Sequence, residues 1–166
     1  KDFVDVLSQE LAGISINFGR HLERTIYIPF DHTEEDSHQN LPMDWAKWIM
    51  AVLDSREGPT IVQNASFEVA VTARNLQVFP QPPFDTQIMS SYVDENIDSG
   101  LKNLSKHYFN YDQVTYQEVT QGKAMCELPA SQVLHYGCDD SLITSHLFEL
   151  FRLIMKLEGS WKFYCE

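Results

Sequence analysis

The stretch LAGISINFGRHLERTIYIPF, residues 11–30, decides the fold class of this chain. Residues 11–18 and 25–30 are rich in β-branched and aromatic residues, and the polar segment 19–23 separates them. Two such runs joined by a short polar turn that contains glycine are typical of a β-hairpin. Residues 3–6 (FVDV) predict a further short strand ahead of it. The chain is therefore expected to open with three strands.

Beyond the polar segment 31–40, the pattern changes to alternating strand and helix units. Residues 60–63 predict a short buried strand, and the Pro-rich stretch 79–84 predicts a loop. We expect helices at residues 43–53, at 67–76, after Thr86 up to Val93, at 100–108 and at 131–155. No firm prediction is made for residues 110–127. The order indicates an α/β protein with a mixed central sheet and flanking helices.

Two of these helices carry specific expectations. In the helix over residues 43–53, the side chains of Trp45, Trp48, Ile49 and Leu53 are spaced to form one apolar face. Ser99 stands directly before the helix at 100–108, and serine is a favoured N-cap residue. We therefore expect one apolar face that includes both tryptophans on the first of these helices, and a Ser99 cap on the second.

The composition is that of an ordinary globular protein, with 43% hydrophobic and 22% charged residues. A length of 166 residues suits one domain spanning residues 1–166. No apolar run approaches the ~20 residues of a membrane span, and the start lacks the pattern of a signal peptide. Three cysteines without CxxC spacing indicate reduced thiols. We expect a soluble, intracellular and cytoplasmic protein with no membrane partner.

The net charge of −12 bears on the class of partner. A protein that binds nucleic acid mainly by neutralising phosphates is usually basic. Two interpretations follow: either no nucleic acid is bound, or bound metal ions offset an acidic site. The charge alone favours the first interpretation.

The most informative local motif is Tyr136-Gly-Cys-Asp-Asp140 in the last expected helix. Residues four apart lie on one face of a helix, one turn from each other. The Asp140 carboxylate can ligate a metal, and the Tyr136 phenol beside it can orient a water. For an isolated motif of this kind, a core tyrosine next to a solvated acidic pair is the commoner interpretation.

A second motif, Asn64-Ala-Ser-Phe67-Glu68, directly follows the short strand at residues 60–63. It places polar groups at the carboxyl end of a strand, where open α/β sheets bind ligands. The alternative is an ordinary N-cap with an exposed acidic residue in the first turn, which the helix dipole favours. In the segment Phe84-Asp85-Thr86, Asp85 is expected to cap a helix rather than to catalyse. The histidines, including His32, show no ligand spacing.

Taken in order, these segments resemble a known family more specifically than any one of them does. LAGISINF, TIYIPFDH, IVQNASFE, FDTQIMSSYVDEN, GLKNLSKHYF and YGCDDSLITSHL together resemble the proofreading 3′→5′ exonuclease domain of family A (Pol I-like) DNA polymerases. This family is the DEDDy subgroup of the DnaQ-like/RNase D superfamily. The resemblance covers nearly the whole chain and implies a ribonuclease H-like (DnaQ-like) fold.

The resemblance implies removal of nucleotides from single-stranded DNA 3′ ends by two-metal-ion hydrolysis. Carboxylate ligands suit two Mg²⁺ or Mn²⁺ ions. The family's partner is a polymerase domain in the same or another chain, and the aromatic tail residues Trp161, Phe163 and Tyr164 would either dock to it or complete this domain's own core. The implied site consists of the metal ligands Asp5, Glu68 and Asp140, of Tyr136 as the residue that positions water, and of Asn64 and Phe67 at the terminal nucleotide.

The chain departs from the family pattern at two positions. Glu68 stands where the family has Asp, and glutamate keeps the charge, so we expect it to be tolerated. The family's Asp-x-Glu pair on the first strand is absent, and Asp5 in FVDV is its nearest equivalent. The spacing from Asp5 to Gly13 is also shorter than in the family, which suggests that a short segment carrying the Glu is missing after Val6.

Two alternatives remain open at this stage. The domain is a catalytically degenerate exonuclease fold that serves as a nucleic-acid-binding or structural module, since fold alone does not imply activity. Otherwise it is an RNase D-like nuclease that trims RNA and shares the tyrosine-containing motif.

Overall fold

The computed structural model describes residues 10–19, 21–33, 39–78 and 83–166. The expected strand at residues 3–6, and Asp5 with it, lies outside the described residues. Two 3₁₀ turns, Leu22–Arg24 and Met125–Glu127, accompany the main elements. These elements are β1 (Gly13–Asn17), β2 (Thr25–Pro29), α1 (Met43–Ser55), β3 (Ile61–Val62), α2 (Ala65–Leu76), β4 (Phe84–Asp85), α3 (Thr86–Val93), α4 (Leu101–Phe109), α5 (Tyr116–Thr120), α6 (Ala130–Glu158) and α7 (Trp161–Cys165).

The hairpin expected from residues 11–30 is confirmed. β1 pairs with β2 in antiparallel register, with Gly13 opposite Pro29 and Asn17 opposite Thr25. The pairing requires glycine at position 13, because a Cβ there would lie 2.9 Å from the carbonyl oxygen of Ile28 and would collide with the Tyr27 phenol.

The expected single mixed sheet is replaced, among the described residues, by two separate strand pairs. β3 pairs in parallel with β4, with Ile61 beside Phe84 and Val62 beside Asp85. The sequence prediction had ended the Pro-rich loop at Phe84 and missed β4. A strand of two residues carries no periodicity of its own, so only its pairing with β3 defines it.

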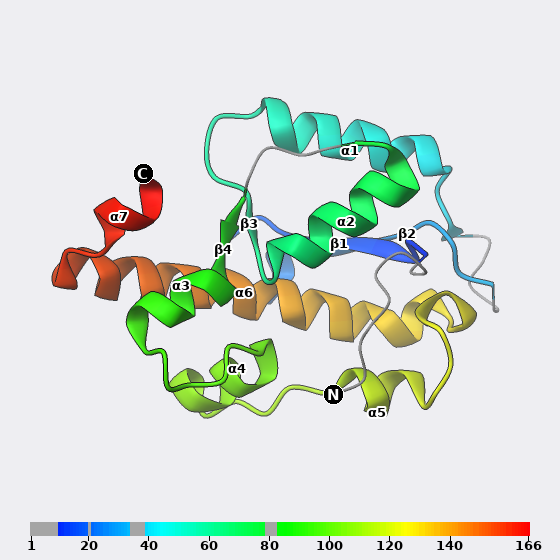
Figure 1. The fold of residues 1–166 in the computed structure, drawn as a ribbon. Coiled ribbons are helices and arrows are strands. Elements are labelled where there is room, and N and C mark those ends of the chain that lie inside the picture. Colours follow the sequence, from blue (N-terminus) through cyan, green and yellow to red (C-terminus); the bar gives the residue numbers. More distant parts are fainter. Residues whose placement is uncertain (1–9, 20, 34–38, 79–82) are drawn as a thin grey trace.

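Figure 1 shows the strands between two helical layers, with α1 and α2 on one side and α6 on the other. α6 contacts β1, β2 and β3, so one helix supports both strand pairs. Gly137 allows this close approach, because a Cβ there would lie 3.1 Å from the ring of Tyr27. Ser145 of α6 also donates a hydrogen bond to the side-chain oxygen of Asn17 (2.9 Å).

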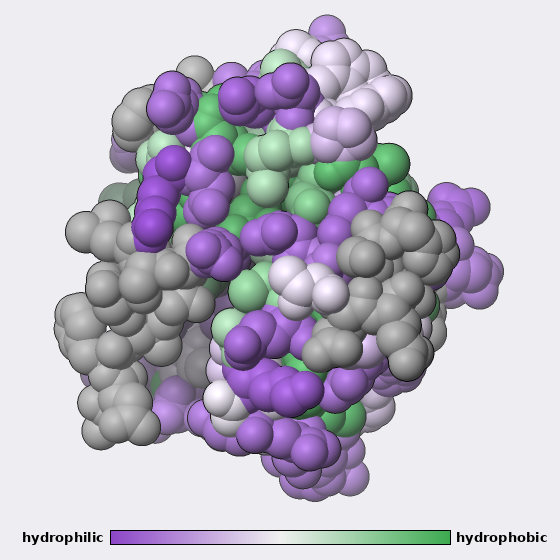
Figure 2. Space-filling view, turned by 90° about the vertical axis from the view of Figure 1, so that its right-hand side faces the viewer, coloured by the Kyte–Doolittle hydropathy of each residue, from purple (hydrophilic) through white to green (hydrophobic). Residues whose placement is uncertain are grey.

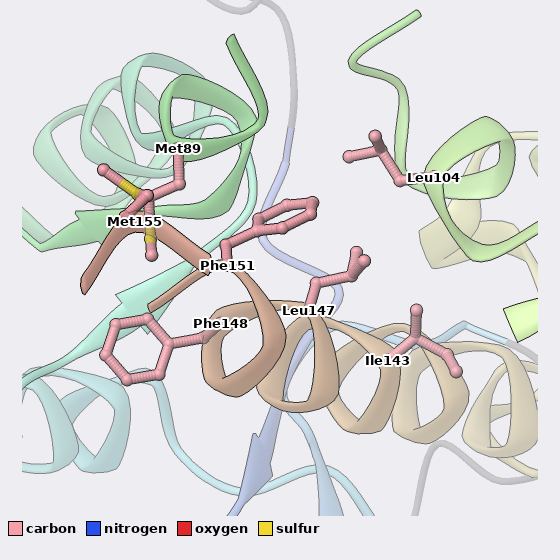
Figure 3. Packing of buried hydrophobic residues seen from close by; sticks show 7 residues of the cluster. All are labelled: Met89, Leu104, Ile143, Leu147, Phe148, Phe151 and Met155. Atoms are coloured by element: carbon pink, nitrogen blue, oxygen red, sulfur yellow. The ribbon is translucent and has the colours of Figure 1, made fainter. Parts of the chain in front are cut away.

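The main hydrophobic core lies between α6, α3 and α4 (Figure 3). Its fully or nearly fully buried side chains are Met89, Leu104, Ile143, Leu147, Phe148, Phe151 and Met155. The five from α6 recur at helical spacing, which explains why the long helix could be predicted from the sequence.

The aromatic tail completes this core. Trp161 stacks on Phe84 with ring centroids 5.6 Å apart, and the Tyr164 hydroxyl accepts a hydrogen bond from the backbone N–H of Asp85 (2.8 Å). Phe163, in contrast, is exposed. Of the two roles considered for the tail, Trp161 and Tyr164 therefore take the one within the domain.

The expected apolar face of α1 is wrong in part. Trp45 and Trp48 are 52% and 60% exposed and pack edge-to-face against each other. The inward positions are taken by Ala46, which is fully buried, and by Ile49. Ile49 belongs to the expected face, so the inward side of α1 is rotated toward Ala46 and away from the two tryptophans. In Figure 2, side chains of intermediate hydropathy gather at the top, where α1 lies.

The expected cap of α4 is also wrong. Gly100, not Ser99, is the N-cap residue, and it makes no side-chain hydrogen bond. The Ser99 carbonyl oxygen instead accepts a hydrogen bond from the Gln63 side chain (2.8 Å). Ser99 therefore joins the α4 start to the end of β3.

Two expectations from composition agree with the structure. Cys126, Cys138 and Cys165 are free thiols. Within the described ranges, no helix has the length and apolar character needed to cross a membrane.

Candidate active site

Tyr136 and Asp140 lie one turn apart on the same side of α6, away from its ends. The Tyr136 phenol and the Asp140 carboxylate lie close enough for each to shift the pKa of the other. Burial, and then the negative charge of Asp140, raise the pKa of Tyr136 above its ordinary value. The phenol therefore keeps its proton.

Lys102 of α4 is the second partner of this pair. Its Nζ forms an ion pair with Asp140 Oδ1 and lies 4.5 Å from the centroid of the Tyr136 ring. Burial raises the pKa of Asp140, and the Lys102 ammonium acts in the opposite direction. The candidate site thus contains a cation that the sequence motif alone did not indicate.

Asp139 is buried, at 7% exposure, so the interpretation of a solvated acidic pair is wrong. Its two oxygens accept hydrogen bonds from the Tyr111 hydroxyl (3.1 Å) and from the Gln113 side-chain amide (2.9 Å). The same amide group donates to Asp140 Oδ1 at 3.0 Å. The segment between α4 and α5, for which no firm prediction was made, therefore holds both carboxylates in place.

The second predicted motif lies at the end of β3. Asn64 is the N-cap of α2 and has a left-handed backbone with φ 65°, a conformation that few non-glycine residues adopt. Its side-chain oxygen accepts hydrogen bonds from the Ser66 hydroxyl (2.8 Å) and the Phe67 N–H (3.4 Å). Phe67 packs partly buried against the smaller core between α1 and α2.

Asp85 fixes the start of α2 in this conformation. Its buried carboxylate accepts hydrogen bonds from the backbone N–H groups of Asn64 (3.0 Å), Ala65 (2.8 Å) and Gln87 (2.8 Å). The expectation that Asp85 caps a helix is confirmed for α3, and it extends to α2. Asp85 therefore positions the candidate substrate-binding residue Asn64.

Glu68 lies in the first turn of α2. Its side chain keeps solvent-exposed surface, yet the protein packed around its carboxyl group, and then the negative charge of Asp85, raise its pKa to about 7. A carboxylate that binds protons near neutral pH is typical of functional sites.

The carboxylates present have the chemistry that divalent cations require, but not the number. Hard divalent ions bind oxygen ligands, which Glu68 and Asp140 supply. Among the residues that the structure describes, however, no three His, Cys, Asp or Glu side chains gather in a metal-binding group. These residues therefore do not form a metal site on their own, and the third predicted ligand, Asp5, falls within residues 1–9.

The structure also shows what the motif search missed. Lys102, Tyr111 and Gln113 were not singled out, because each reaches the site across a distance in sequence that no spacing rule covers. Asp139 was part of the quoted motif, and its burial next to Asp140 is visible only in three dimensions.

Solved nuclease structures share this fold. An "apo form of the nuclease" superposes with a TM-score of 0.62 at 17% identity, covering 95% of this chain and 78% of that chain. Brucella melitensis NrnC bound to pGG gives a TM-score of 0.61 at 19% identity, and NrnC without a named ligand gives 0.62 at 21%; both cover 99% of this chain and 82% of theirs.

No curated protein matches the sequence closely enough to count as a relative. The family model described as 3′-5′ exonuclease matches residues 3–156. This range includes every candidate site residue, from Asp5 to Asp140. The chain belongs to the 3′-5′ exonuclease family.

Proposed function

We propose that this domain removes nucleotides one at a time from the 3′ ends of single-stranded DNA, as a proofreading exonuclease does. The observation that carries the proposal is the placement of Tyr136 beside Asp140 on α6, within a chain that matches the exonuclease family along most of its length. The same family membership supports a ribonuclease H-like topology.

Each candidate residue has a distinct role in this proposal. Asp140, Glu68 and Asp5 would hold two Mg²⁺ or Mn²⁺ ions, which would lower the pKa of a bound water and stabilise the departing oxygen. Tyr136 would orient the attacking water, because its phenol is protonated and lies beside Asp140. Asn64 and Phe67 contact the terminal nucleotide. A polymerase domain, in the same or another chain, would supply the mismatched 3′ ends.

RNA is the second candidate substrate. The structural neighbour NrnC was solved bound to pGG and in another structure with bound Mg²⁺, and its fold covers nearly all of this chain. An RNase D-like trimming activity on short strands therefore suits the same site. The alternative of a catalytically degenerate module is supported by the Lys102–Asp140 ion pair, because the ammonium takes up a carboxylate oxygen of a proposed metal ligand.

The decisive experiment offers matched single strands of DNA and RNA, each labelled at the 5′ end, in Mg²⁺ or Mn²⁺. We expect a ladder of products shortened from the 3′ end, with the DNA strand degraded faster. A faster RNA ladder would assign the trimming function instead. Absence of any ladder from the complete protein, with either strand and either metal, would support the degenerate module.

A further inference from the structure

We propose that Lys102 is the resident counter-ion of Asp140: it holds the carboxylate until a divalent cation arrives, and then releases it. This inference rests on the proposed function, which makes Asp140 a cation ligand. Lys102 touches no reacting atom in this scheme, so it is a positioning residue.

The ion pair is partly shielded from solvent. The side chains of Lys102 and Asp140 are 27% and 24% exposed, in contrast to the next lysine on the same helix, Lys106, whose pair with Asp112 is 52% and 77% exposed. Exposed pairs contribute little because water and salt screen them. Of these two ion pairs on α4, the Lys102–Asp140 pair is therefore the one in which removal of the ammonium affects the partner carboxylate more.

Lys102 and a divalent cation compete for the same oxygen. Asp140 Oδ1 already receives the Lys102 ammonium and the Gln113 amide (3.0 Å). A cation bound to Oδ1 would face the ammonium at short range, where two positive charges repel each other strongly in a partly buried site. Because the Gln113 amide also holds Asp139 at 2.9 Å, Lys102 is the partner that moves.

The Lys102 ammonium can move while the backbone of its helix stays in place. Its backbone is in the first turn of α4, which Leu104 anchors in the main core at 0% exposure. The ammonium is the mobile end of a flexible four-carbon stem, and the Tyr136 ring beneath it, 4.5 Å away, keeps it beside the site.

The test measures cation binding without nucleic acid. Free Mn²⁺ is titrated by electron paramagnetic resonance in the wild type, in Lys102→Met, and in the matched control Lys106→Met, which removes the same charge from the same helix. We expect Lys102→Met to bind Mn²⁺ roughly five-fold more tightly, as loss of a competing ion pair of this kind implies. Lys106→Met should match the wild type, and Asp140→Asn should weaken binding.

A second arm measures strand degradation. Lys102→Met should lower the Mn²⁺ concentration that gives half-maximal strand shortening, and Lys102→Arg, which keeps the positive charge, should restore the wild-type value. A purely structural role for Lys102 would not tighten Mn²⁺ binding.

The outcomes separate the two proposals. Active wild-type protein together with unchanged Mn²⁺ affinity in Lys102→Met would overturn the counter-ion role and leave the exonuclease function intact. Mn²⁺ binding that is unaffected by Asp140→Asn, with no strand shortening in any variant, would overturn both.

Discussion

The carboxylate of Asp85, in β4, binds the backbone N–H of Asn64, at the end of β3, across 3.0 Å. This contact joins the two parallel strands at their carboxyl ends and holds Asn64 at φ 65°. A residue that reads in sequence as a helix cap therefore also shapes the candidate substrate-binding motif.

Replacing Asp85 should destabilise the fold strongly. Asp85→Ala leaves the N–H groups of Asn64, Ala65 and Gln87 without their acceptor beside a side chain that is 4% exposed. Buried donors without acceptors cost about 1–3 kcal/mol each, so we expect a loss of about 3 kcal/mol or more in the free energy of unfolding, measured with urea. The control Asp44→Ala, at an exposed ion pair, should change it little; equal losses in the two variants would contradict the role of Asp85.

The hairpin should not tolerate a side chain at position 13. Gly13→Ala places a Cβ against the Tyr27 phenol and 2.9 Å from the Ile28 carbonyl oxygen, and overpacking of this kind costs about 1–3 kcal/mol. In Gly137→Ala the contact is with the Tyr27 ring at 3.1 Å, and the better helix propensity of alanine offsets part of it. Thermal unfolding should show a larger fall in Tm for Gly13→Ala, and the reverse order would contradict the described register.

The stability of the cation-free protein should depend on Glu68 as pH changes. Because the folded-state pKa is raised from the ordinary 4.5 to about 7, the folded state binds more protons than the unfolded state between these values, and stability falls as pH rises through this window. Glu68→Gln should remove that slope. It should be more stable than the wild type at pH 8 and differ little at pH 4.

Solvent contact at Glu68 makes the effect smaller than the full pKa change implies. Urea unfolding in EDTA at a series of pH values measures it. A wild-type stability that rises between pH 4.5 and 7 more steeply than that of Glu68→Gln would contradict the raised pKa.

Tyr136→Phe should slow strand degradation and leave cation binding nearly unchanged. The substitution removes the hydroxyl beside Asp140 and keeps the ring under Lys102. Loss of an orienting group costs roughly a hundred-fold in kcat, measured under single-turnover conditions. Tyr92→Phe, at an exposed tyrosine outside the site, serves as the control. Loss of Mn²⁺ binding in Tyr136→Phe would contradict the proposed role.

The sequence predicted those parts of the fold that local patterns determine. The hairpin follows from two β-rich runs around a turn, and α6 from apolar residues such as Leu147 and Phe151 at helical spacing. β4 was missed because two residues carry no pattern. Trp45 and Trp48 were assigned to the apolar face of their helix because they share helical spacing with Ile49 and Leu53, and spacing alone does not tell which of these side chains a neighbouring element covers.

The candidate site was predicted in the same partial way. Tyr136 and Asp140 are one turn apart on a helix, so their proximity follows from spacing alone. Lys102 and Gln113 reach Asp140 from 38 and 27 residues away, and no short motif encodes such contacts. The cation-binding role of Asp140 and Glu68 remains a prediction from the family resemblance.

The central claim is that Asp140 is required for shortening of a strand from its 3′ end. The most direct measurement follows a 5′-labelled single-stranded DNA oligonucleotide in Mg²⁺ or Mn²⁺ with the wild type and with Asp140→Ala. Asp112→Ala is the control, because the Asp112 carboxylate forms an exposed ion pair with Lys106 of α4. We expect stepwise shortening by the wild type and Asp112→Ala, and none by Asp140→Ala or after addition of EDTA. Shortening by Asp140→Ala at the wild-type rate would contradict the account.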